Sequence, residues 1–241
     1  MKQFPKTEVY SIFSILAGLA GIAMQSWLLT TVDHKGLLTR NHISAIISFL
    51  LLAAIVVVNI LFLKKQKSAE GYKQMFPNSL VSGVGSFLAA VGFLFATLSA
   101  NTNGLLEILV KVFGFLSVIA LAFAGYCRLM KKRPNCLLYA VVAVFLILRT
   151  LVYCQGWSAE IQVERYFFPL LGSLCLLLAA YYRAALVIGT EDWRRYQFFR
   201  QIAIYSCLLS VVTGDTLFFL AGALWMTTDY CIPTAAEDPA E

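Results

Sequence analysis

Two residues of opposite charge lie inside long apolar stretches of this sequence, where a charged side chain is unexpected. Arg149 falls within the apolar run 136–156, and Asp215 falls within the run 202–226. An unpaired charge inside a bilayer costs at least about 2.5 to 3.5 kcal/mol, so each side chain is expected to face other helices and to find a partner. A rise of about 1.5 Å per residue places the two at nearly the same depth. We therefore predict that Arg149 and Asp215 are paired, directly or through water.

Other polar and aromatic residues fall in the same half of these runs and outline a candidate pocket. Gln25 lies in the first apolar run and Lys111 in the fourth. Tyr153 and Trp157 follow Arg149 at four-residue spacing, which keeps all three on one helix face. An arginine among aromatic side chains suits an anionic or aromatic ligand. The candidate ligand-binding residues are Arg149, Asp215, Lys111, Gln25, Tyr153 and Trp157.

The same residues also have a purely structural interpretation. A pair formed by Arg149 and Asp215 can fix helix packing without binding anything. Glu107 and Lys111 are spaced as a favourable helix pair and can reach toward the lipid head groups. A proton-relay role for Asp215 is a third alternative, and the sequence leaves these interpretations open.

The elements that must position these side chains are membrane-spanning helices. Apolar residues make up 60% of the 241-residue chain and charged residues only 13%, whereas a soluble domain carries about 25% charged residues. Each apolar run is close to the roughly 20 residues that cross a bilayer, and strands would leave backbone groups unpaired in lipid. We expect one all-α transmembrane bundle of about seven spans. The expected spans are 9–31, 43–63, 79–100, 105–127, 136–156, 166–189 and 202–226, followed by a short acidic outer tail at 227–241.

The distribution of basic residues predicts the orientation of this bundle. Of the 19 lysines and arginines, 14 fall in loops or run ends on one side of a seven-span arrangement and only three in loops on the other. The positive-inside rule places the basic side in the cytoplasm, with the N-terminus inside and the C-terminus outside. The first run is longer than the core of a signal peptide, so we expect it to remain as a span, with cleavage as the alternative.

Small residues and aromatic residues predict how the spans pack and where they meet water. Gly85, Ala89, Gly92 and Ala96 share one face of the run 79–100, which favours close helix packing and a central position for that span. Trp225 is expected at the outer interface. The basic, aromatic segment 190–201 fits either an ordinary loop with membrane anchors or a stretch lying along the lipid surface.

Several other chemistries find no support in the residue pattern. Six cysteines and two histidines show no metal-ligand spacing, and no nucleophile motif, phosphate loop or dinucleotide fingerprint is present. We therefore expect no metal, no cofactor and no enzymatic activity. A disulfide between Cys154 and Cys231 is topologically feasible if both face outward. The net charge of +6 lies in short clusters between apolar runs, so the partner is a lipid bilayer and not nucleic acid.

The stretches WSAEIQVERYFF from Trp157 and AAYYRAAL from Ala179, with Arg149 before them, resemble small seven-span bacterial membrane proteins of no known activity. The resemblance implies a bacterial cell membrane, and no functional residue is carried over from it.

Two functions of different classes compete on these observations. The first is binding or transport of a small polar or anionic molecule through an outward-facing intramembrane pocket. The second is a membrane-embedded subunit or sensor that acts through partner contacts, which the lack of repeats and of Gly/Pro-broken spans favours. An intramembrane enzyme is less favoured, because Asp215 and Glu107 are the only candidate acid–base pair. Oligomeric state and protein partner remain open.

Overall fold

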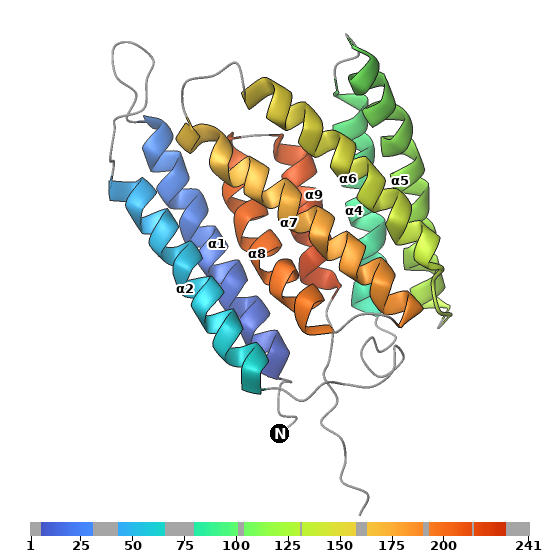
Figure 1. Cartoon of the computed structure of the whole chain (residues 1–241), viewed down its shortest axis with the longest axis horizontal. Coiled ribbons are helices and arrows are strands. Elements are labelled where there is room, and N and C mark those ends of the chain that lie inside the picture. Colours follow the sequence, from blue (N-terminus) through green and yellow to red (C-terminus); the bar gives the residue numbers. More distant parts are fainter. Residues whose placement is uncertain are drawn as a thin grey trace, which may run out of the picture.

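The computed structural model describes residues 6–30, 43–65, 80–100, 104–130, 132–157, 163–189, 193–213 and 215–229, and all of its regular elements there are α-helices (Figure 1). The helices are α1 (Lys6–Thr30), α2 (Ile43–Lys65), α4 (Leu80–Leu98), α5 (Leu105–Leu129), α6 (Cys136–Trp157), α7 (Val163–Ile188), α8 (Trp193–Thr213) and α9 (Thr216–Thr228). Six of them, α1, α2, α4, α5, α6 and α7, are long and apolar enough to cross a bilayer. The chain is therefore a multi-pass helical membrane protein, as its composition predicts.

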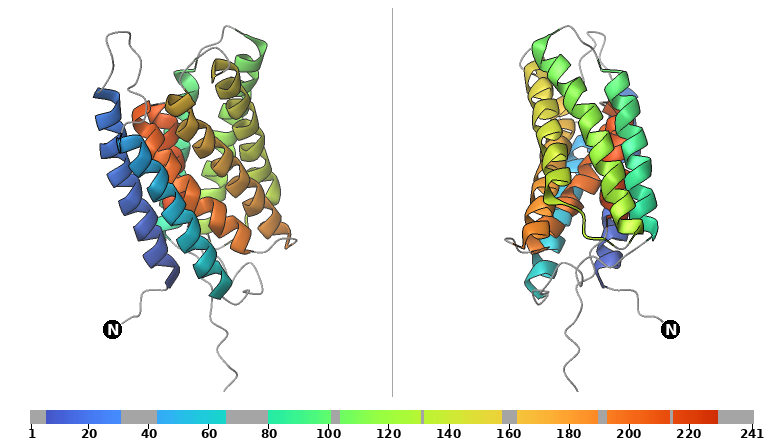
Figure 2. Two further views of the ribbon diagram at one scale, coloured as in Figure 1. Left: turned by 60° about the vertical axis from the view of Figure 1, so that its left-hand side comes forward. Right: turned by 90° about the vertical axis from the view of Figure 1, so that its right-hand side faces the viewer.

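The last predicted span, 202–226, is wrong as a single helix. Helix α8 ends at Thr213 and α9 begins at Thr216, and α9 runs back along α8 in the opposite direction (Figures 1 and 2). Thr213, Gly214, Asp215 and Thr216 at the break are a local helix-stop and helix-start signal, because glycine disfavours helix interiors and aspartate favours the position before a first turn. At about 1.5 Å per residue α8 is about 31 Å long and α9 about 20 Å. Asp215 thus lies at a helix break and not in the middle of a span.

The centre of the bundle is α8. It packs against α1, α2, α7 and α9, and every side chain from Arg200 to Ser210 is buried. In Figures 1 and 2, α1 and α2 lie on one side of the α8–α9 hairpin, α4, α5 and α6 lie on the other, and α7 crosses in front. The expectation that 79–100 is the central span is wrong, because α4 exposes one apolar face and packs with the other.

The start of α8 also corrects the interpretation of 190–201. Residues 193–201 form the first turns of α8, neither a loop nor a separate stretch along the lipid surface, while 190–192 lie outside the described residues. Trp193, Tyr196 and Arg200 are fully buried there. One face of the beginning of α8 is buried against other helices and contains polar and charged side chains, whereas Arg195 on another face is exposed.

Glycines set the closest helix approaches. A Cβ atom on Gly85 would collide with the side chain of Thr228, and one on Gly92 would lie 2.6 Å from the Cβ of Ala221. The predicted small-residue face of α4 is thus the face that α9 covers. On α1, a Cβ on Gly18 would lie 2.5 Å from the side chain of Leu208. The absence of a side chain at Gly18 therefore also allows α1 to pack closely against α8.

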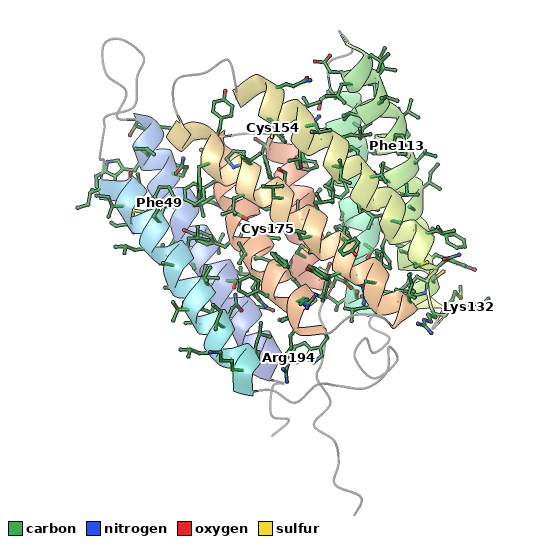
Figure 3. All side chains as sticks on the ribbon, in the orientation of Figure 1. Phe49, Phe113, Lys132, Cys154, Cys175 and Arg194 are labelled. Atoms are coloured by element: carbon green, nitrogen blue, oxygen red, sulfur yellow. The ribbon has the colours of Figure 1, made fainter. Side chains whose placement is uncertain are left out.

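Most of the basic residues that the structure describes lie at one end of the bundle, which we call the basic end. It comprises the C-terminal ends of α2, α5 and α7 and the beginning of α8, and Figure 3 shows Lys132 and Arg194 there. Arg133 donates a hydrogen bond to the carbonyl of Val187 and ties the α5–α6 connection to α7. The opposite end, which we call the far end, contains Cys154 (Figure 3).

The path of α9 changes the expected position of the chain's last part. Because α9 returns, Asp229 lies at the basic end, in contact with Arg128, Arg183 and Tyr196. The prediction that the segment from residue 227 onward lies on the side opposite the N-terminus is therefore wrong for residues 227–229. Residues 230–241 lie outside the described residues. The expected disulfide between Cys154 and Cys231 stays a prediction, because Cys231 lies outside the described residues.

We predict that a cysteine added after Glu241 reacts with a membrane-impermeant thiol reagent from the same side as Lys132→Cys. A Gly104→Cys variant should react from the other side, because Gly104 is exposed at the far end. Labelling of right-side-out and inverted vesicles, with Cys136, Cys154 and Cys231 replaced by serine, measures this. An added cysteine that reacts from the side of Gly104→Cys would contradict the α8–α9 return.

We predict that Gly85→Ala lowers the thermal stability of the detergent-solubilised protein. Thr228, whose side chain a new methyl group would meet, is held by hydrogen bonds to the carbonyls of Leu224 and Trp225 and has little freedom to move. Overpacking of this kind costs about 1 to 3 kcal/mol. Gly104→Ala is the matched control, because nothing lies within 4 Å of the position that a Cβ atom would take there. Equal melting temperatures for the two variants would refute the close α4–α9 packing.

Candidate functional site

Asp215 directly precedes the first residue of α9, at the N-cap position, yet its side chain does not cap that helix. Its carbonyl accepts the first helical hydrogen bond, from the N–H of Phe219 at 3.0 Å. Its carboxylate makes no cap hydrogen bond and instead pairs with the guanidinium of Arg149 on α6. The predicted Arg149–Asp215 pair is confirmed. The carboxylate is still stabilised by the positive end of α9, because it sits at the N-terminus of that helix.

Aromatic rings hold the guanidinium in place. The Cζ atom of Arg149 lies 5.4 Å from the ring centroid of Tyr153 and 5.4 Å from that of Phe218. Tyr153 in turn stacks on Phe219, with centroids 5.8 Å apart. The prediction that Arg149 lies among aromatic groups is therefore confirmed. Phe218, one of the two rings that contact the guanidinium, belongs to α9, and residue spacing within 136–156 could not predict this contact.

A cavity of about 280 Å³ adjoins the pair at the far end of the bundle. Its walls come from the end of α4, the first two turns of α5, the last part of α6 and the start of α9. The lining residues are Ser99, Ala100, Glu107, Val110, Arg149, Val152, Tyr153 and Asp215. Asp215 is the more exposed member of the ion pair, with 23% of its side chain accessible against 11% for Arg149.

The cavity unites only half of the predicted site residues. Arg149, Asp215 and Tyr153 line it, whereas Lys111 is half-buried one turn beyond Glu107 and does not. Gln25 is buried on α1, which packs on α2 and α8, away from α6. Trp157 is the last residue of α6, and its side chain lies outside what the structure describes.

A second polar cluster, at the basic end, centres on the carboxylate of Asp229. Arg128 and Arg183 both form ion pairs with it, the latter with its Nε atom 3.1 Å from Oδ2. The hydroxyl of Tyr196 donates to Oδ2 at 2.7 Å, and that of Ser82 donates to Oδ1 at 3.3 Å. One carboxylate thus joins the end of α9 to α4, α5, α7 and α8. Asp229 is 1% exposed, so these contacts act in a low-dielectric environment where each is strong.

Arg200 secures the same end of α9 through the backbone. Its Nε atom donates to the carbonyl of Met226 at 2.6 Å and its Nη2 atom to that of Thr227 at 3.3 Å. Carbonyls in the last turn of a helix lack partners within the helix, and a cation there also offsets the helix dipole. Arg200 therefore acts as a C-terminal cap supplied by a neighbouring helix.

Aromatic packing completes this cluster and corrects one more expectation. Trp225 is 1% exposed and stacks on Tyr139, so it is a core residue at the basic end and not an anchor at the outer interface. Tyr139 also faces the guanidinium of Arg183, whose Cζ atom lies 5.3 Å from the ring centroid.

Sequence reasoning missed the Asp229 cluster for an identifiable reason. The positive-inside rule counts Arg128, Arg183 and Arg200 as charges at water-facing loops and helix ends, and the seven-span interpretation placed Asp229 on the other side. The available signal was the sequence TGDT at 213–216, which marks a helix break inside an otherwise uniform apolar run. If TGDT is interpreted as a turn between two antiparallel helices, Asp229 is predicted to lie at the same end of the bundle as the three arginines.

Within the described residues no group of three or more His, Cys, Asp or Glu side chains could hold a metal ion, and both histidines lie outside them. Neither a protein-family model nor a curated protein nor a solved structure matches this chain.

We predict that Asp229→Asn strongly destabilises the protein. The change removes the carboxylate with which two buried arginines pair, and breaking a buried ion pair from one side costs about 3 to 5 kcal/mol. The melting temperature or the folded fraction by size-exclusion chromatography in detergent measures this. Lys132→Gln, which removes an exposed charge at the same end, is the control and should change little. An Asp229→Asn variant as stable as Lys132→Gln would show that the cluster contributes little to folding.

Proposed function

We propose that this protein binds a small polar molecule in the cavity at its far end and carries it into or across the membrane, without a chemical step of its own. The observation that supports this most directly is a cavity of about 280 Å³ that is lined by the Arg149–Asp215 ion pair where α9 begins. Charged side chains within a membrane protein usually face its interior or a cavity, and they often mark the path of a substrate.

The arrangement in the membrane follows from the same features. The basic end faces the cytoplasm by the positive-inside rule, and the cavity faces outward. With α8 and α9 as an antiparallel hairpin, the described part of the chain has eight helices in alternating directions, so the N-terminus and Asp229 lie on the cytoplasmic side. A bacterial plasma membrane is the proposed location.

The alternative is a subunit or sensor without a substrate. It drew on the absence of broken spans, and the α8–α9 hairpin leaves that argument in place, because α8 is continuous and α9 runs antiparallel to it. A structural role for the Arg149–Asp215 pair remains its strongest argument. The next experiment separates a structural pair from a ligand site.

We predict that at least one small polar compound raises the melting temperature of the wild-type protein in detergent. The panel contains amines, amino acids, nucleosides and small anions. The reciprocal variant Arg149→Asp with Asp215→Arg is the control. It keeps an ion pair at this position but exchanges the positions of the two charges that line the cavity. The shift should be absent in this folded variant.

Two results would contradict the proposal. An equal shift in the reciprocal variant would place the ligand elsewhere. Stabilisation of the wild type by lipids only, with no response to any water-soluble compound, would favour the subunit or sensor function.

A further inference from the structure

Two side chains in the wall of the far-end cavity have hydrogen-bond donors without an acceptor among the described residues. The donors are Nε of Arg149 and the hydroxyl of Tyr153. We infer that these two donors bind an oxygen acceptor of the ligand, as in a carboxylate or an amide carbonyl, while Asp215 keeps its ion pair with Arg149. This inference rests on the proposed function, because it names the chemical group that the same site recognises.

Both donors come from one face of α6. Arg149 and Tyr153 are four residues apart on that helix, and the Cζ atom of Arg149 lies 5.4 Å from the ring centroid of Tyr153. Asp215 pairs with Nη2 of the guanidinium, and Nε is left without an acceptor. Carboxylate and amide oxygens each have two lone pairs, so one such group can accept hydrogen bonds from two neighbouring donors.

The surroundings make these donors unfavourable for the protein alone. Tyr153 packs against Phe218 and Phe219, and both donor atoms are buried. A buried donor without a partner has lost its hydrogen bonds to water, and a guanidinium bonds to oxygen more strongly than a neutral donor does. A ligand oxygen would satisfy both donors. Because these atoms are covered in the structure, binding requires a small movement of side chains in the cavity wall.

The chemistry of the donors and the size of the cavity narrow the ligand class. A protonated amine is itself a donor and can satisfy neither Nε of Arg149 nor the hydroxyl of Tyr153. A cavity of about 280 Å³ lies just below the usual range of about 300 to 1,000 Å³ for small-molecule sites. Carboxylic acids and amides of a few carbon atoms are therefore suitable. The anionic ligand expected from the sequence is one member of this class, and a neutral amide is the other.

The first test requires no ligand. Tyr153→Phe removes a hydroxyl that has no partner among the described residues, so its melting temperature in detergent should equal or exceed that of the wild type. Tyr205→Phe is the matched control, because the hydroxyl of Tyr205 donates to the carbonyl of Ser48 at 2.7 Å. That variant should melt roughly 2 to 4 °C lower, as the loss of one buried hydrogen bond predicts for a chain of this length. A Tyr153→Phe variant that melts as low as Tyr205→Phe would overturn the inference, because the hydroxyl would then have a partner within the protein.

The second test compares propionate, propionamide and propylamine, which are similar in size, whereas only the first two contain an oxygen acceptor. Propionate, propionamide or both should raise the melting temperature of the wild type and of Tyr205→Phe, and propylamine should not. The comparison of propionate with propionamide shows whether the acceptor is charged. In Tyr153→Phe the concentration that gives half of the shift should be roughly tenfold higher, as the loss of one hydrogen bond to a bound ligand predicts.

The results that overturn this inference differ from those that overturn the proposed function. A shift with propylamine equal to that with the oxygen compounds, or a shift that Tyr153→Phe leaves unchanged, would overturn the inference and leave the cavity as a binding site. The same holds if neither propionate nor propionamide acts while another compound of the larger panel stabilises the protein. A lack of response to every water-soluble compound would overturn the proposed function as well.

Discussion

The carboxylate of Asp229 is the interaction on which the arrangement of this bundle depends most. It forms ion pairs with Arg128 and Arg183 and accepts hydrogen bonds from the hydroxyls of Tyr196 and Ser82. The end of α9 is thereby joined to four other helices, α4, α5, α7 and α8. Buried arginines are tolerated in a membrane protein only where such a partner exists. This explains how an apolar chain can place guanidinium groups in its interior at one end.

The short helix α9 is held by charge at both of its ends. Asp215 precedes its first residue and pairs with Arg149, and Asp229 follows its last residue and pairs with Arg128 and Arg183. Arg200 adds hydrogen bonds to the last carbonyls. Between these ends α9 packs against the small-residue face of α4, where Gly85 and Gly92 leave no space for a Cβ atom. Electrostatics thus fixes the position of α9 along the bundle, and close packing fixes its distance from α4.

A central helix that packs mainly against other helices can carry polar residues that a lipid-facing helix cannot. Gln201 on α8 donates to the hydroxyl of Ser11 on α1 at 2.9 Å, and Tyr205 donates to the carbonyl of Ser48 on α2 at 2.7 Å. Each bond satisfies a buried donor and specifies one register between neighbouring helices. The α1–α2 pair is attached to the bundle through this polar seam, while the cavity lies on the other side of α9.

The sequence by itself determined the solvent, the secondary structure and one long-range contact. Apolar runs of bilayer length impose helices, and the high cost of a lone charge in lipid was enough to pair Arg149 with Asp215 across 66 positions of sequence. Only the tertiary structure decided the direction of the last helix, the identity of the central helix and the composition of the cavity. The reason is that hydropathy measures how apolar a segment is, and not whether lipid or protein surrounds it. For this reason the polar start of α8 was predicted to be a loop. The apolar composition of 202–226 likewise predicted one span, although the segment contains two antiparallel helices. The position of Asp229 beside the arginines depends on contacts among five helices, which a hydropathy pattern does not contain.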